Sequence, residues 1–165
     1  MRCPACSQAD VVNELGVTEY PEARLPYPVV LQGVPIQRCP ACGDVSVSIP
    51  DPEGLHEVLC RHIVTVNRAL LPGEIRFLRR FLDRDAGAMA ALMGVDAKTL
   101  SRWENGKQKM GAVAERLLRV IVANHLRVKD RGFPEKLFPA LRDEVVARPE
   151  ALTLTQAERG WREAA

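Results

Sequence analysis

Four cysteines in two Cys-Pro-Ala-Cys motifs are the residues of this chain whose spacing most clearly predicts chemistry. Cys3 and Cys6 form the first pair, and Cys39 and Cys42 form the second. Each motif folds a tight turn that brings two sulfurs within about 4 Å of each other, and two such turns complete the tetrahedron of a zinc site. Four sulfur ligands leave no open position for water. We therefore expect one structural, non-catalytic Zn²⁺ per chain.

Redox chemistry and unpaired structural cysteines are the alternatives to zinc. A single CxxC motif beside a βαβ unit would indicate a thioredoxin-like dithiol, but this chain has two motifs and neither lies in a βαβ pattern. The fifth cysteine, Cys60, lies in an apolar helical stretch and is most simply a small buried hydrophobe. His56, His62 and His125 have no ligand-like spacing.

The residues around the two motifs predict short strands. Apolar residues cluster at 29–36 and alternate with serines at 45–49, a pattern typical of a small sheet, and Gln32-Gly33 is a candidate hairpin turn. A segment of this size buries little apolar surface, so zinc should hold it together. We therefore expect a zinc ribbon over residues 1–50.

The rest of the chain has helical periodicity. Asp51 is a good N-cap for a linker helix over residues 51–71, with Pro52 at its first position. Caps, turn glycines and apolar spacing then predict five further helices, at residues 75–82, 85–93, 96–104, 112–126 and 134–146.

The expected fold class is α+β. A small zinc ribbon of antiparallel strands (1–50) is joined by the linker helix (51–71) to an all-α, five-helix domain (72–146), and the ribbon and the helical domain should have separate cores. The C-terminal tail (147–165) is polar and weakly patterned, and no function is assigned to it.

Residues 86–105 fit a helix-turn-helix. Ala90 is small enough for two helices to approach closely, and Gly94 can adopt the positive φ of the tight turn. The positions that the motif packs inside are apolar: Met89, Met93, Val95, Leu100 and Trp103. The outward positions and the following loop would enter the major groove, or contact phosphates beside it. The candidate DNA-binding residues are therefore Ala97, Lys98, Thr99, Ser101, Arg102, Asn105 and Lys107.

Charge is distributed unevenly between the two ends. Residues 72–128 carry eleven basic and six acidic side chains, whereas residues 1–50 carry three basic and five acidic ones. Six basic residues flank the helix-turn-helix: Arg76, Arg79, Arg80, Arg84, Lys107 and Lys109. Three short helices with a glycine turn also occur in proteins that never touch DNA, so the basic surroundings matter to the DNA-binding hypothesis. They indicate a nucleic-acid partner for one end and a different partner for the other.

The run from Val95 to Gly106 resembles the recognition helix of Xre/Cro-type repressors, whose pattern is Gly-Val-Ser-x-x-Thr-Val/Ile/Leu-Ser-Arg-Trp/Tyr-Glu-x-Gly. Together with the N-terminal CPxC…CPxCG pattern, it resembles the MqsA-type (YgiT-type) zinc-ribbon antitoxins over roughly residues 1–128. The resemblance implies a dimeric repressor whose zinc domain grips a ribonuclease toxin and whose C-terminal domain binds a palindromic operator. It implies that Lys98 and Arg102 read bases, although the family has Asn at the position of Lys98. Asp85 stands where many Xre-type proteins have Ser.

An acidic zinc module would complement a basic, RNA-cleaving toxin. Exposed strand edges near Val29–Leu31 or Val45–Ile49 would offer a site for strand addition. The alternative is that the acidic residues only keep a small zinc module soluble.

Two other functions compete with that of an antitoxin. One is a stand-alone transcriptional regulator of the same architecture, and the other is an RNA-binding zinc-ribbon protein. The second has too few exposed aromatic residues for base stacking. An enzyme is not expected, because no catalytic triad, paired carboxylates, phosphate loop or open metal site is visible.

Location follows from what the sequence lacks. No apolar run approaches the roughly 18 residues of a membrane span, and no secretory signal is visible. We therefore expect a cytoplasmic protein without a membrane partner, because paired CxxC motifs without an export signal are typical of a reducing compartment.

Overall fold

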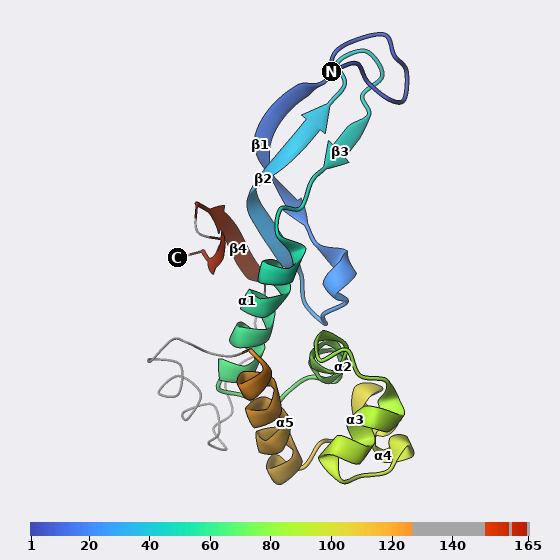
Figure 1. The fold of residues 1–165 in the computed structure, drawn as a ribbon, viewed down its shortest axis with the longest axis vertical. Helices are drawn as coiled ribbons and strands as arrows, with labels where there is room; N and C mark the ends of the chain where they lie inside the picture. Colours follow the sequence, from blue (N-terminus) through green and yellow to red (C-terminus); the bar gives the residue numbers. More distant parts are fainter. Residues whose placement is uncertain (127–150, 159, 165) are drawn as a thin grey trace.

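The computed structural model describes residues 1–126, 151–158 and 160–164. A long, narrow sheet carries the N-terminus at its far tip, and the helices gather around and beyond its other end (Figure 1). The mixed α+β class is therefore confirmed, with zinc-ribbon strands preceding the helices. The helix expected at 134–146 lies outside the described residues.

The sheet is built around one long central strand. β2 pairs antiparallel with β1 on one edge. Its other edge pairs antiparallel with β3 near the tip and parallel with β4 at the opposite end. β5 extends the sheet beyond β4. The five strands are β1 (Val12–Glu19), β2 (Val29–Arg38), β3 (Val45–Val47), β4 (Leu152–Ala157) and β5 (Gly160–Glu163).

The hairpin turn expected at Gln32-Gly33 is wrong. β2 runs through both residues, and the chain reverses earlier, in a connection that contains a short 3₁₀ helix (Pro21–Ala23). Gly33 has a φ of 72° and is an extra residue opposite the Gly16–Val17 step of β1. This bulge shifts the alternation of side chains by one residue. Leu31 and Val34 consequently lie on the same buried face although they are three residues apart.

The C-terminal tail, whose sequence is polar and weakly patterned, contains β4 and β5. Leu152 and Leu154 are buried beside their β2 neighbours, and the Trp161 ring is also buried. The Leu-Thr-Leu-Thr run has the period of two that marks a half-buried strand. The tail is therefore part of the N-terminal sheet.

The linker helix α1 (Pro52–Thr65) packs its apolar face against the sheet. The Asp51 side chain caps it by accepting the Gly54 N–H at 3.0 Å. The helix ends six residues before the predicted boundary at 71. Its last carbonyls are bound by the buried Arg119, whose guanidinium donates to the oxygens of Val64 and Val66 at 2.8 and 2.9 Å. Arg119 belongs to α5 (Ala112–His125).

Three shorter helices, α2 (Pro72–Phe81), α3 (Ala86–Met93) and α4 (Ala97–Glu104), complete the described helical region. The fully buried Glu74 joins α2 to its surroundings. Its carboxylate accepts the Tyr27 hydroxyl at 2.7 Å and two N–H groups of Arg68 at 2.6 and 2.8 Å. Burial and the neighbouring Glu74 raise the pKa of Tyr27 above its ordinary value. One buried polar network thus connects the segment before β2, the linker and α2.

The expectation of separate cores is wrong. One continuous apolar cluster runs from Leu31 of the sheet through Leu59 of α1 to Leu78 of α2 and Leu100 of α4. Helix α1 is the common layer between the two ends. The cysteine motifs are outside this cluster, at the far tip of the sheet.

Candidate metal centre and nucleic-acid interface

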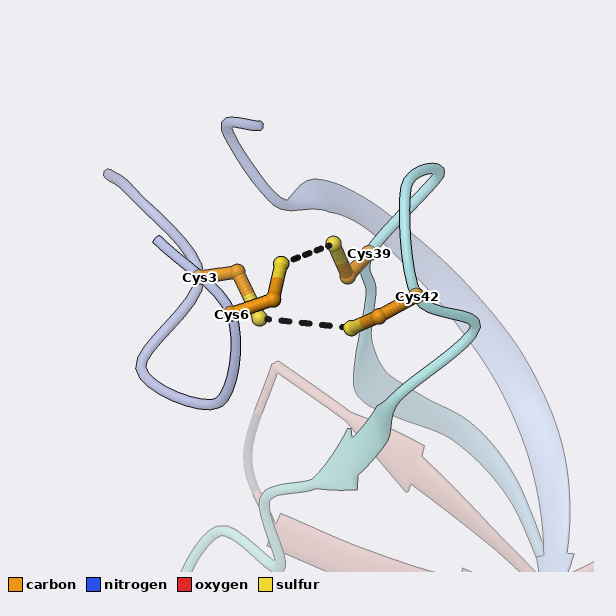
Figure 2. Close-up of side chains that lie close together, drawn as sticks. All are labelled: Cys3, Cys6, Cys39 and Cys42. Carbon is orange, nitrogen blue, oxygen red and sulfur yellow. Dashed lines mark hydrogen bonds between the residues drawn. The ribbon is translucent and has the colours of Figure 1, made fainter. Parts of the chain in front are cut away.

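The four motif cysteines converge at the tip of the sheet (Figure 2). The Sγ atoms of Cys3 and Cys42 are 3.8 Å apart, those of Cys6 and Cys39 are 3.7 Å apart, and all four lie within 4.8 Å of one another. A tetrahedron with Zn–S bonds of about 2.3 Å has S–S edges of roughly 3.8 Å. The cluster therefore has the dimensions of a tetrathiolate zinc site.

The two motifs fold as the same turn. In each, the N–H four residues after the first cysteine donates to that cysteine's carbonyl, from Ser7 to Cys3 and from Gly43 to Cys39, both at 2.9 Å. The residue after the second cysteine has a positive φ, 56° at Ser7 and 75° at Gly43. These turns point both sulfurs of each motif toward one shared point (Figure 2).

The electrostatics of the cluster favour a cation. Backbone N–H groups of Cys42 and Ala41 lower the pKa of the Cys39 thiol to about 7. The backbone N–H of Asp44 also favours the Cys42 thiolate, but hydrogen bonds with the thiols of Cys39 and Cys6 outweigh it and raise the pKa of Cys42 to about 12. Four thiols this close cannot all ionise without strong repulsion between the thiolates, and a bound divalent cation offsets that repulsion. The donor set therefore fits zinc.

The helix-turn-helix has the predicted interior. Met89, Met93, Leu100 and Trp103 are buried, and Val95 packs against the same cluster. Gly94 ends α3 with a φ of 68°. Asp85 caps α3 by accepting the Ala88 N–H at 2.7 Å, so its carboxylate has a structural role at the helix start.

Most candidate DNA-binding residues lie on an exposed face of α4 or just beyond it: Ala97, Lys98, Ser101, Arg102, Asn105 and Lys107. Within the described part of the chain, no ion pair engages Lys98, Arg102 or Lys107. Thr99 is different, since it is half-buried and its hydroxyl donates to Asp96 at 2.7 Å. Hydrogen bonds from the Thr99 side chain and backbone lower the pKa of Asp96. Thr99 therefore completes the N-cap of α4.

The comparison with known families bears on both sites. Residues 1–128 match the family model described as the antitoxin component of the bacterial toxin-antitoxin system, MqsA. The chain belongs to the MqsA antitoxin family. A search of curated proteins found no match.

Membership of the MqsA family confirms the resemblance seen in the sequence and supports a role as an antitoxin and DNA-binding regulator. It also agrees with zinc at the four cysteines. The MqsA family is a family of regulators and not a known enzyme family. No helix among the described residues is long and apolar enough to cross a membrane. The match ends at residue 128, so β4 and β5 lie outside it.

An ion-pair network around the buried Glu104, which the sequence did not reveal, positions α4 on α2. The Glu104 carboxylate accepts two N–H groups of Arg79 at 2.6 and 3.0 Å. Arg76 donates to the Glu104 carbonyl at 3.0 Å and to the Asn105 side chain at 2.7 Å. Two of the basic residues that flank the helix-turn-helix are thus engaged within the protein. The sequence signal for this network was the spacing of three residues between Arg76 and Arg79, which places both side chains on one helix face.

We expect Glu104→Gln to lower the free energy of unfolding by about 2 kcal/mol, because Arg79 would face a neutral amide in a site with little access to water. Urea unfolding measures the loss. Glu53→Gln, at an exposed position of α1, is the matched control and should change stability little. Equal effects of the two variants would show that the network does not hold α4.

Proposed function

We propose that this protein is a homodimeric, sequence-specific repressor and the antitoxin of a type II toxin-antitoxin pair. Its helix-turn-helix would bind a palindromic operator, and its zinc-bearing sheet would bind a ribonuclease toxin. Family membership supports the antitoxin and regulator role. The observation that carries the proposal is the outward face of α4, where exposed Lys98, Ser101 and Arg102 stand on a helix fixed by Asp96 and Glu104.

The side chains of this face suit different parts of a duplex. Arg102 has a planar guanidinium that can donate two hydrogen bonds to a guanine edge, and Lys98 can reach base acceptors one turn earlier on the helix. Ala97 could contact a thymine methyl group, and Lys107 lies after the helix, where a phosphate contact is expected. The Asn105 amide is held by Ser101 and Arg76. Asn105 and Thr99 would therefore support the reading face more than contact bases.

An operator with two-fold symmetry needs a two-fold protein, and α5 offers the surface. Leu118 and Val122 are buried, as expected for the core side of this helix. Val113, Leu117 and Val120, at helical spacing, are 81%, 41% and 47% exposed. A stripe of large apolar side chains exposed to this extent indicates a contact with a second copy.

We expect Leu117→Glu to weaken dimerisation by about tenfold or more, because a carboxylate would be desolvated in the apolar contact. Sedimentation velocity at micromolar concentration without DNA measures it. Leu92→Glu, at an exposed leucine of α3 outside the stripe, is the control. An unaltered protein that is monomeric both free and on operator DNA would contradict the dimer.

One of the two strand edges that the sequence offered for toxin binding is covered. The edge at Val29–Leu31 is closed, because β4 pairs with it. β1 offers a longer site, since no strand among the described residues pairs with its outer edge. Its Leu15 and Val17 side chains are 76% and 61% exposed, and Glu14 and Glu19 are exposed beside them. An exposed edge, apolar side chains and acidic neighbours suit a strand of a basic protein.

We expect the full chain to relieve the toxicity of a small basic protein encoded next to it. Leu15→Arg should lower the affinity for that protein by at least about tenfold, because it adds like charge and removes an apolar contact. Isothermal titration calorimetry measures binding, and Leu92→Arg on α3 is the control. If Leu15→Arg and the control bound the neighbouring protein with equal affinity, β1 would not be the toxin-binding surface.

The second candidate function, a stand-alone regulator, predicts a different result in the same experiment. The helix-turn-helix face would still bind its operator, but no neighbouring gene would encode a toxic protein. RNA binding receives no separate support from the described surface of α4, whose groups suit duplex DNA.

A further inference from the structure

The C-terminal hairpin of β4 and β5 lies outside the matched family region and yet is part of the protein core. β4 pairs in parallel with β2 from Val29↔Leu152 to Gln32↔Thr155. Leu154 is completely buried and Trp161 is 7% exposed. Two strands from the C-terminal part of the chain therefore complete the N-terminal sheet at the end away from the cysteines (Figure 1).

The hairpin also grips α1 near both of its ends. At the start of the helix, the Trp161 indole N–H lies 3.0 Å from the Pro50 carbonyl and 3.2 Å from that of Asp51. In the last turn, His62 Nδ1 lies 2.9 Å from a Glu163 carboxylate oxygen. These contacts join the hairpin to both ends of α1. Burial of the Trp161 ring excludes water from the first of them.

Helix α1 is in turn fixed to the DNA-binding end. Arg119 of α5 is completely buried and donates to carbonyls at and beyond the α1 C-terminus, including that of Arg68 at 2.6 Å. Arg68 itself is paired with Glu74 of α2. Since the Arg119 guanidinium is completely buried, movement of α1 away from α5 would deprive a buried charge of its hydrogen bonds.

We propose that the C-terminal hairpin is a clamp that makes the zinc-bearing sheet and the DNA-binding helices one rigid body. Without the hairpin, α1 would lose its contacts with Trp161 and Glu163, and β2 would expose the apolar edge at Val29–Leu31. With it, the direction of the β1–β2 hairpin is set relative to α4. A partner bound to β1 would then have a fixed position relative to the operator, so that binding of the partner would change the affinity for DNA and binding of DNA the affinity for the partner. Only this last consequence rests on the proposed function.

Residual dipolar couplings of the full, zinc-loaded chain test the clamp in the absence of DNA and toxin. One alignment tensor should describe the amides of β1–β2 and of α2–α4 in the unaltered protein. We expect Trp161→Ala to require two different tensors, while the chemical shifts of α2–α4 stay in place. Arg162→Ala, at the exposed neighbouring position of β5, is the matched control and should keep one tensor.

A single tensor in Trp161→Ala would overturn the clamp. If that variant unfolds entirely, Trp161→Phe decides with the same readout, because it keeps a ring and removes the N–H donor. A divergence of the two tensors there supports the proposal, and an unchanged single tensor overturns it. Failure to find a toxin would remove the regulatory consequence but would leave these couplings, and hence the clamp, unaffected.

Discussion

Replacement of Cys39 by serine is expected to release the zinc and melt the tip of the sheet, while the remainder of the chain stays folded. The unaltered protein should hold one zinc, bound by the cysteines in positions 3, 6, 39 and 42. Zinc binding in small cysteine sites is worth about 10–16 kcal/mol of folding free energy. Among the described residues, the motifs contribute no side chain to the continuous apolar cluster, so we expect the metal to hold the tip together. Metal analysis and amide exchange at residues 1–11 and 38–47 measure the two effects.

Cys60→Ser is the control for this change. It removes the same sulfur from a completely buried position in α1, far from the tip. It should therefore keep one zinc per chain and lose about 1 kcal/mol or more of stability, because a hydroxyl replaces a buried thiol. Full zinc retention by Cys39→Ser would remove that cysteine from the ligand set. Melting of α1 and the sheet along with the tip would show that the metal supports more than the two motifs.

The parts of this molecule that were predictable from sequence are those specified by local pattern. The two cysteine motifs fold by hydrogen bonds within five residues, such as that from Ser7 to Cys3. The helix-turn-helix is set by caps at Asp85 and Asp96 and by the turn at Gly94. Each signal lies within the element it specifies, so no knowledge of the tertiary fold was needed.

The parts that were missed depend on residues far apart in the chain. Gly33 has the character of a turn residue, but it becomes a bulge because β1 and β2 pair along their whole length. The strands at the C-terminus form because β2 offers an open edge more than 100 residues earlier. Arg79 is basic and near the DNA-binding helices, but Glu104 engages it across the α2–α4 contact. In each case tertiary pairing decided between local possibilities that the sequence left open.

The exposed cations of the recognition face are expected to divide between base reading and phosphate contact. Arg102→Ala should weaken binding to a two-fold-symmetric duplex, selected from a random pool, by about 1–3 kcal/mol per half-site, or roughly 5- to 150-fold for each. The loss should fall mainly on one base position, because removal of a bidentate donor relaxes discrimination there. The half-sites should lie about one helical turn apart or a multiple of that.

Lys107→Ala separates these roles in the same titrations. Lys107 lies after α4 and is exposed, as Arg102 is, so both variants remove one positive charge from one face of the protein. Loss of a phosphate contact should weaken all duplexes alike and reduce the salt-dependence slope by about one per contact. Arg102→Ala should instead reduce the ratio of specific to random binding. If Arg102→Ala weakened selected and random duplexes equally, Arg102 would be a phosphate contact, and base reading would have to come from Lys98 and the remainder of the α4 face.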